Sequence, residues 1–116
     1  MSASSLNLYH SRVSSFDYGI HFDATAPHFL RVDCTTLTGN GVGIYVNNLG
    51  SGNVTRSNIY ENSFAGVQNF GGSTLQAKTN WWGHPNGPTL PNGPTYGDRV
   101  IGKVATQQYA TSKVVC

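Results

Sequence analysis

The stretch LYHSRVSSFDYGIHF, which runs from Leu8 to Phe22, can be laid over two later stretches of the same chain. These are VDCTTLTGNGVGIYV from Val32 and VTRSNIYENSFAGVQNF from Val54. A fourth stretch, LQAKTNWWG from Leu75, starts in the same way and then departs, so the four starts are separated by steps of 24, 22 and 21 residues. Short strand-like pieces that recur with such a period are typical of stacked repeats. The sequence therefore predicts a solenoid.

Apolar residues alternate with polar ones within each stretch, as a half-buried strand requires. Each inward residue would stack on its equivalent in the next repeat, about 4.8 Å away, so that the repeats share one narrow apolar core. The residues expected to face inward are Leu8, Val13, Phe16, Ile20 and Phe22, then Val32, Leu37, Ile44 and Val46, then Val54, Ile59, Phe64 and Val67.

Asn40 and Asn62 fall at matching places before the glycine-hydrophobe step, and Phe16 occupies that place in the first stretch. A stacked asparagine at a solenoid corner can bond backbone groups of adjacent repeats, and asparagine tolerates a left-handed backbone. We therefore interpret both asparagines as structural, and a sugar- or metal-binding role is the alternative. A positive φ angle or a tight bend is expected at the recurring glycines. These are Gly19, Gly43 and Gly66.

Length and composition limit the class of protein. At 116 residues the chain is expected to form a single domain. Its 14 glycines and its charged content of only 10% disfavour long helices and suit short strands with tight turns. The net charge is +2 and the seven basic residues are scattered, so no nucleic acid partner is expected. No apolar run approaches the roughly 18–20 residues of a membrane span, so no membrane partner is expected.

The N-terminal sequence MSASSLNLYHS lacks the charged and apolar regions of a secretory signal. A complete chain would therefore be cytoplasmic, and a mature piece of a longer secreted protein would be extracellular. Cys34 falls at an expected inward position and Cys116 is the last residue. Since no spacing resembles a zinc-ligand pair, two free thiols are the favoured interpretation. A bridge between them would need the C-terminal tail to fold back on the second repeat.

Two further motifs lie beyond the repeats: NWWGHPNGPT at residues 80–89 and GDRVIGKV at residues 97–104. With its recurring asparagine and glycine-isoleucine pattern, the chain resembles right-handed parallel β-helix proteins of the pectate-lyase-like class from about Leu6 to Lys103. The two motifs look like the closing portion of bacterial β-helix repeat proteins, and the chain departs from that pattern after Val104. The resemblance implies an all-β fold: a short right-handed parallel β-helix of about four coils with a Trp/Pro-rich C-terminal cap.

The expected coils of this single domain are residues 6–29, 30–53, 54–74 and 75–84, with the cap and tail at 80–116. Trp81 and Trp82 can cover the apolar end of the last coil, and the following prolines prevent another regular coil. We interpret Trp82 as structural and keep Trp81 as a candidate for stacking on a sugar. No cap is visible at the other end, so either further coils precede it or, as we expect, a homo-oligomer such as a dimer forms there.

The resemblance also implies carbohydrate chemistry, which normally needs two carboxyl groups about 5–10 Å apart. The chain has five acidic residues, and the overlay places no two of them on neighbouring rungs of one column. Asp33 falls in an outward column with Tyr9, Thr55 and Gln76, away from Asp17. If the protein is an enzyme, the outward groups expected to act are Asp33, Asp17 and His21.

The sequence thus favours a non-catalytic β-helix module with a structural or assembly role and weak glycan binding. The alternative is a carbohydrate-active enzyme, a polysaccharide lyase or hydrolase, or the C-terminal fragment of one. No cofactor or metal is expected for the module, and calcium would be expected only for a lyase. The candidate ligand-binding residues are Tyr45, Asp23, Asn47, Asn48 and Trp81.

Overall fold

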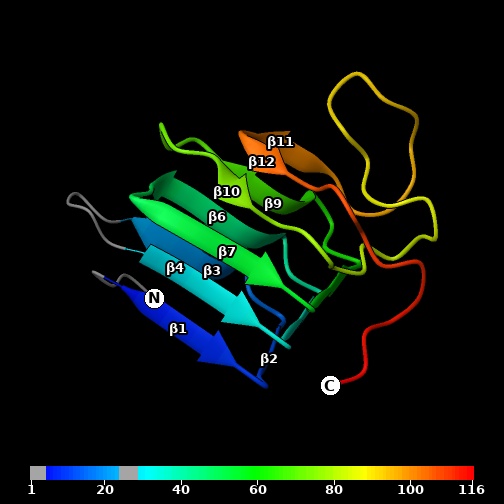
Figure 1. Cartoon of the computed structure of the whole chain (residues 1–116), viewed down its shortest axis with the longest axis horizontal. Coiled ribbons are helices and arrows are strands. Elements are labelled where there is room, and N and C mark those ends of the chain that lie inside the picture. The colour runs from blue at the N-terminus through cyan, green and yellow to red at the C-terminus, as the bar shows by residue number, and fades with distance from the viewer. Residues whose placement is uncertain (1–4, 24–28) are drawn as a thin grey trace.

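Three parallel β-sheets form the fold in the computed structural model, which describes residues 5–23 and 29–116 (Figure 1). Sheet A has the order β1 (Leu6–Tyr9), β4 (Phe29–Asp33), β7 (Ser51–Thr55), β10 (Leu75–Gln76), β12 (Val104–Ala105). Sheet B has the order β2 (Arg12–Ser14), β5 (Thr36–Thr38), β8 (Asn58–Tyr60). Sheet C has the order β11 (Val100–Gly102), β9 (Ala65–Asn69), β6 (Val42–Asn48), β3 (Tyr18–Asp23). The described residues contain no helix, so the fold is all-β.

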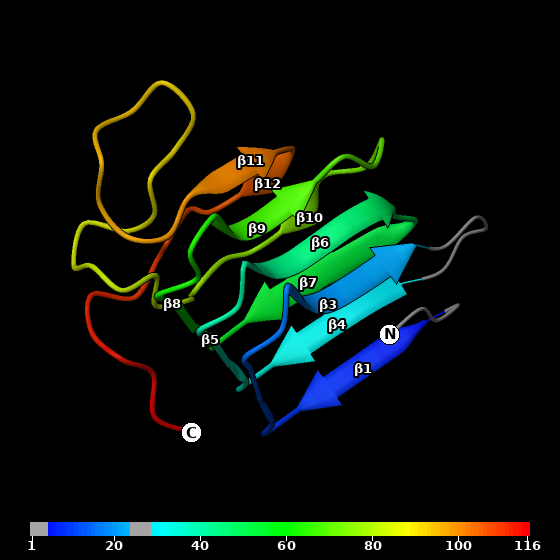
Figure 2. The same cartoon turned by 180° about the vertical axis from the view of Figure 1, so that it is seen from behind.

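The chain visits sheets A, B and C in the same order three times in succession, as the views from the two sides show (Figures 1 and 2). Every strand pair among the described residues is parallel. From β1 to β10, a strand meets its neighbour only after a passage through the other two sheets. In sheet A, Val32 lies opposite both Leu8 and Val54. The first three stretches therefore pair in the register that the overlay predicts.

The predicted register is wrong by two residues in the fourth stretch. Gln76 pairs with Asn53, so Leu75 lies level with Gly52 and not with Val54. A Cβ on Gly52 would lie 2.7 Å from Leu75 Cδ1, so the leucine side chain fills the space that the missing side chain leaves. Burial of Leu75 against this glycine thus decides the register, whereas the overlay matched one apolar residue to another.

Apolar side chains fill the interior between the three sheets. The buried members include Ile20, Phe22, Leu30, Val32, Leu37, Ile44, Val46, Val54, Ile59, Val67, Leu75, Trp82 and Val100, with Leu8 and Val13 partly buried against them. Phe16 and Phe64, which were predicted to face inward, are instead 60% and 53% exposed. Both follow a corner where the backbone has a positive φ, at Ser15 and Glu61, so the alternation of the preceding strand does not continue through them.

Each passage from sheet A to sheet B contains one residue with a left-handed backbone. These residues are His10, Cys34 and Arg56, and Thr79 has the same backbone conformation in the segment that follows β10. A side-chain ladder follows the corner: the Thr35 N–H donates to Ser57 Oγ at 3.1 Å, and the Ser57 N–H donates to Asn80 Oδ1 at 3.0 Å. These bonds satisfy buried backbone groups where the chain leaves the strand pairing.

A second ladder crosses the corner between sheets B and C and contains both predicted asparagines. The Phe16 N–H donates to Asn40 Oδ1, and the Asn40 N–H donates to Asn62 Oδ1, each at 3.1 Å. Asn62 Nδ2 donates to Asp98 Oδ2 at 2.7 Å, which ends the ladder on a carboxylate. Asn40 and Asn62 are both buried, so their amides replace backbone pairing at this corner.

The recurring glycines Gly19, Gly43 and Gly66 do not have the predicted positive φ. They lie in or beside strands of sheet C, where a Cβ on Gly19 would lie 2.7 Å from the Gly43 carbonyl oxygen. A Cβ on Gly43 would lie 2.5 Å from the Gly66 carbonyl oxygen. Close approach of neighbouring strands, and not backbone conformation, therefore explains these glycines.

The expectation of two free thiols is wrong, because Cys34 and Cys116 form a disulfide with a Cα–Cα distance of 6.1 Å. The tail does fold back: Asn58 Nδ2 donates to the Val114 carbonyl at 3.0 Å, and the Val114 N–H donates to Asn58 Oδ1 at 2.7 Å. The Ala110 N–H donates to the Asn80 carbonyl at 2.8 Å. These contacts fasten the tail beside sheet B and bring the last residue to the corner at Cys34.

Candidate functional site

An aromatic hollow of about 500 Å³ lies over the outer face of sheet C. Tyr45 is its centre: the ring centroid lies 5.0 Å from that of Tyr18, 5.1 Å from that of His21 and 5.9 Å from that of Phe70. Tyr18 and Phe70 are about half exposed, at 48% and 55%. The residues that line the hollow are Asp17, Tyr18, Gly41, Val42, Tyr45, Phe64, Gln68 and Phe70.

Strand alternation puts these rings on the outside. In β6, Ile44 and Val46 face the core, so Tyr45 between them faces outward. The parallel register then stacks His21 and Gln68 on either side of Tyr45. The hollow is therefore a product of the same periodicity that builds the core.

Two further hollows adjoin the first along the corner between sheets B and C. A middle hollow of about 460 Å³ shares Asp17 and Gly41 with the aromatic hollow. An end hollow of about 350 Å³ shares Glu61 with the middle one. The residues that line the end hollow are Tyr60, Glu61, Trp81, Trp82, Gly83, Tyr96, Gly97, Asp98 and Lys113. We call the three together the corner groove.

Two acidic residues line the end hollow together, although the overlay placed no two acids on neighbouring rungs of one column. Glu61 follows β8 and Asp98 precedes β11, and both line this hollow. Asp98 lies in the segment without a repeat, which is why the overlay could not place it. Burial raises the pKa of Asp98 to about 6, against the opposing effect of the hydrogen bonds from Asn62.

The raised pKa of Asp98 predicts how stability depends on pH. The unfolded chain would take up this proton near the ordinary pKa of 3.8, whereas the folded protein does so near 6. Between these pH values the folded state binds more protons at Asp98 than the unfolded chain does. The contribution of Asp98 to the free energy of unfolding therefore rises as the pH falls from about 6 to about 4, by roughly 1 kcal/mol after solvent screening. Asp98→Asn keeps an acceptor for Asn62 and should remove this rise in urea denaturation at the two pH values. An unchanged pH dependence in this variant would contradict the prediction.

The candidates Asp23, Asn47 and Asn48 lie together at the far end of sheet C and bind one another. Asn48 Nδ2 donates to Asp23 Oδ1 at 2.7 Å and Asn47 Nδ2 donates to Asp23 Oδ2 at 3.3 Å. The Asn48 bond, followed by the Asn47 bond, lowers the pKa of Asp23. The carboxylate of Asp23, which was expected to bind a ligand, thus already accepts hydrogen bonds from both amides.

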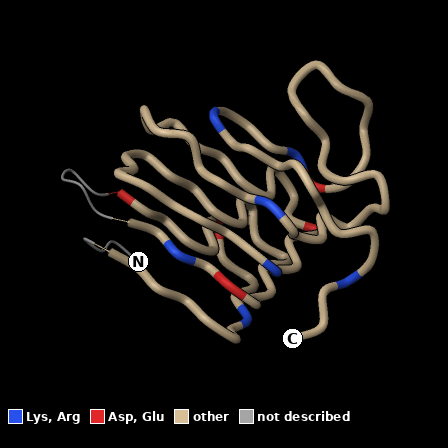
Figure 3. The backbone as a smooth tube through the Cα atoms, in the orientation of Figure 1, with Lys and Arg blue, Asp and Glu red and all other residues tan. Residues whose placement is uncertain are grey.

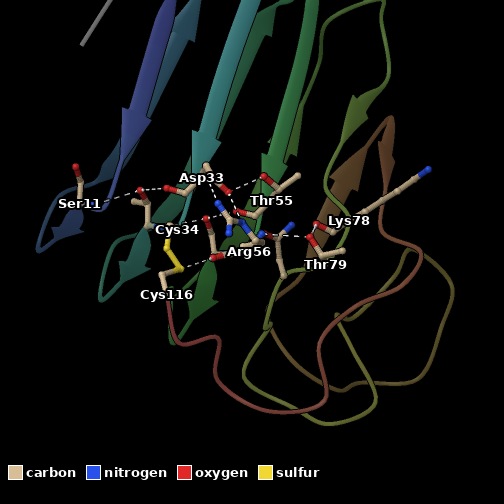
Figure 4. Close-up of polar contacts among 11 residues, drawn as sticks. Ser11, Asp33, Cys34, Thr55, Arg56, Lys78, Thr79 and Cys116 are labelled. Atoms are coloured by element: carbon tan, nitrogen blue, oxygen red, sulfur yellow. Dashed lines mark hydrogen bonds and ion pairs between the residues drawn. A yellow bond between two sulfur atoms is a disulfide. The ribbon is translucent and has the colours of Figure 1, made fainter.

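Asp33 lies outside the corner groove, on sheet A, and is held in an ion pair (Figure 4). Arg56 Nη2 and Nε donate to Asp33 at 2.5 and 3.0 Å, and Thr55 Oγ1 donates to it at 2.9 Å. The Arg56 hydrogen bond is the main cause of the lowered pKa of Asp33. Asp33 ends β4 in sheet A, whereas Asp17 lies in the bend between β2 and β3, so the structure does not bring these two candidate acids into one site.

The structure brings together Asp17, His21 and Tyr45 around the aromatic hollow, and it places Trp81 in the end hollow. Trp82 is fully buried in the core. The residues that sequence reasoning missed are Tyr18, Phe64, Gln68, Phe70, Glu61 and Asp98. The alternation of inward and outward residues along the strand could have identified Gln68. The exposure of Phe64 depends on the left-handed corner at Glu61, and the position of Asp98 depends on the segment after Trp82, which has no repeat.

Residues 5–23 and 29–116 contain no group of three or more His, Cys, Asp and Glu side chains that could hold a metal ion. The chain has only five acidic residues, which come from separate segments of the backbone (Figure 3). The described part of the chain also has no apolar helix of the length that a membrane span requires. A separate cavity of about 500 Å³ between the proline-rich loop and the tail is lined by residues such as Pro88, Leu90 and Tyr109, without a carboxylate, lysine or arginine.

Comparisons of the chain with protein-family models, with curated proteins and with solved structures found no match.

Proposed function

We propose that the chain is a short right-handed parallel β-helix of about four coils, closed at its C-terminal end by Trp82 and the proline-rich segment, and that it serves as a non-catalytic glycan-binding module. Three features support the fold part of the proposal. The strands recur in sheets A, B and C, asparagine and hydroxyl ladders cross the corners, and Trp82 is buried against the last coil.

The cluster of rings around Tyr45 supports the binding part. A sugar ring presents an apolar face that can lie on an aromatic side chain, while its hydroxyl groups need hydrogen-bonding partners. The aromatic hollow supplies both, since Tyr45 and Phe70 stand beside the amide of Gln68 and the carboxylate of Asp17. A pocket of apolar walls with a few polar groups is the usual form of a small-ligand site.

Replacing Tyr45 with alanine is expected to weaken glycan binding about ten-fold, because the central ring of the hollow is lost. Isothermal titration against a panel of neutral and charged oligosaccharides measures the effect, with and without calcium.

Tyr9→Ala is the matched control, since Tyr9 is 57% exposed on sheet A and lies outside the corner groove. Equal binding by Tyr45→Ala and Tyr9→Ala would contradict the proposed site. A panel that contains no binding sugar would contradict the proposed function itself.

The alternative of a carbohydrate-active enzyme, with calcium if it is a lyase, gains one observation from the structure. Glu61 and Asp98 line the same hollow, and glycoside hydrolysis uses two carboxyl groups of which one has a raised pKa. We favour the binding module because Asp98 Oδ2 already accepts two hydrogen bonds from Asn62, which gives it a structural task. Release of reducing or unsaturated sugar ends from the same panel would favour the enzyme.

We also propose a homo-oligomer, a dimer in its simplest form, through the end of the fold formed by β1, β2 and β3. In the part of the chain that the structure describes, no strand pairs with the outer edges of these three strands. Unpaired edges favour association, and a second copy would offer the same edges in return. Light scattering at micromolar concentration distinguishes a dimer from the monomer that would contradict this proposal.

A further inference from the structure

Most of the acidic residues of this protein lie in one groove. Of the five acids in the chain, Asp17, Glu61 and Asp98 line the corner groove. Among the described residues, Lys113 of the tail also lines the groove, and Arg99 lies over the Phe64 ring at the aromatic hollow. The groove therefore carries more acidic than basic side chains, in a protein whose net charge is +2.

Cationic groups of the protein already lie on the aromatic walls of this groove. In the end hollow, the ammonium nitrogen of Lys113 stands 4.7 Å from the ring centroid of Tyr60. At the aromatic hollow, the guanidinium carbon of Arg99 lies 5.8 Å from the ring centroid of Phe64. Ring faces attract cations at these distances. The two contacts show that the walls suit positive charge, and Lys113 is the natural competitor of an incoming ammonium group.

The carboxylates discriminate between classes of sugar. A uronate would bring like charge beside Asp17 and Glu61, and a neutral sugar would leave these acids without an ionic partner. A sugar with a protonated primary amine would pair with them and still offer a ring face to Tyr45 and Phe70. Amino sugars therefore fit all the chemistry that lines the groove.

We propose that the corner groove binds oligosaccharides of amino sugars through their primary ammonium groups, with Lys113 as the built-in occupant of the end hollow. This inference rests on the proposed glycan-binding function and names the class of sugar. The ammonium groups pair with Glu61 and Asp17, while the sugar rings lie on the aromatic walls. Affinity is expected to fall as salt is raised from about 50 to about 300 mM, because exposed charge pairs are screened.

Isothermal titration with a glucosamine hexamer, its N-acetylated form, a galacturonate hexamer and hexalysine tests the inference. The glucosamine hexamer should bind at least ten-fold more tightly than the other three. Equal binding of the N-acetylated hexamer would overturn the amino-sugar inference and leave the glycan-binding function standing. Tighter binding of hexalysine would show a site for basic peptides and overturn both. Binding by none of the sugars would also overturn both.

Variants test the assigned residues. Glu61→Gln and Asp17→Asn should each weaken binding of the glucosamine hexamer roughly five-fold, and Lys113→Ala should strengthen it roughly three-fold. Asp33→Asn is the control that removes an equal charge outside the groove, and it should leave the affinity unchanged. Circular dichroism confirms that each variant is folded. Unchanged affinity in both Glu61→Gln and Asp17→Asn, or an equal loss in Asp33→Asn, would overturn the inference.

Discussion

Gly43→Val is expected to destabilise the protein by about 3 kcal/mol or more, and to prevent folding if the native state has little stability to spare. A Cβ at this position would lie 2.5 Å from the carbonyl oxygen of Gly66 and 3.2 Å from Nδ2 of Asn62. The first of these atoms belongs to the backbone of a neighbouring strand, so it can move away only if β6 and β9 separate. The substitution would therefore disturb sheet C and the asparagine ladder together.

Urea denaturation followed by circular dichroism measures this loss, and Gly72→Val is the matched control. Gly72 is exposed, and a Cβ built on it has nothing within 4 Å. The control is expected to change the free energy of unfolding by less than about 0.5 kcal/mol. Similar losses for the two variants would show that intrinsic glycine preferences, and not the close approach of strands, govern position 43.

Removing the Cys34–Cys116 disulfide is the second change with a large expected effect. The bond joins residues separated by 82 positions, so it restricts the unfolded chain over most of its length. In the chain-entropy account, a disulfide that closes a loop of this size stabilises the folded protein by about 4–5 kcal/mol. The measured loss of stability when a disulfide is removed is typically about 2–4 kcal/mol. We expect the double variant Cys34→Ser/Cys116→Ser to lose about 3 kcal/mol and to melt roughly 10 °C lower.

The unmodified protein with and without a reducing agent provides the comparison for this prediction. Reduction should reproduce the loss in the unmodified protein and should leave the double variant unchanged. The tail should then become sensitive to limited proteolysis after residue 105, since the disulfide and the Asn58–Val114 bonds fasten it together. A melting temperature that does not respond to the reducing agent would contradict the predicted contribution.

The repeat could be recognised in the sequence because, in parallel stacked strands, similar residues one repeat apart contact each other. Val32 lies on Val54 and Asn40 binds Asn62 for the same reason: 22 residues carry the chain once through sheets A, B and C. The two-residue error at Leu75 arose where a glycine, Gly52, stood in the column. A glycine has no side chain that marks its position in the sequence as inward or outward. That Leu75 packs against Gly52 can therefore be seen only in the folded structure.

The candidate site was predictable only in part. Tyr45 could be placed on the outside by alternation, and His21 could be placed beside it by the overlay. Phe64 could not, since the left-handed corner at Glu61 ends the alternation before this residue. The partnership of Asn48 with Asp23 also depends on a bulge after Phe22 that shifts the register, which no periodic pattern contains.

The all-β class, the parallel register of the first three repeats and the asparagine ladder could be predicted from the sequence, because each follows from a period that parallel stacking turns into contacts. That Asp98 lies with Glu61 in one hollow and that Cys116 reaches Cys34 could be seen only in the folded chain. Both contacts involve the segment after Trp82, which has no repeat. Its course depends on the burial of Trp82 and on bonds such as Asn58–Val114, and these join residues too far apart in the chain for any period to predict.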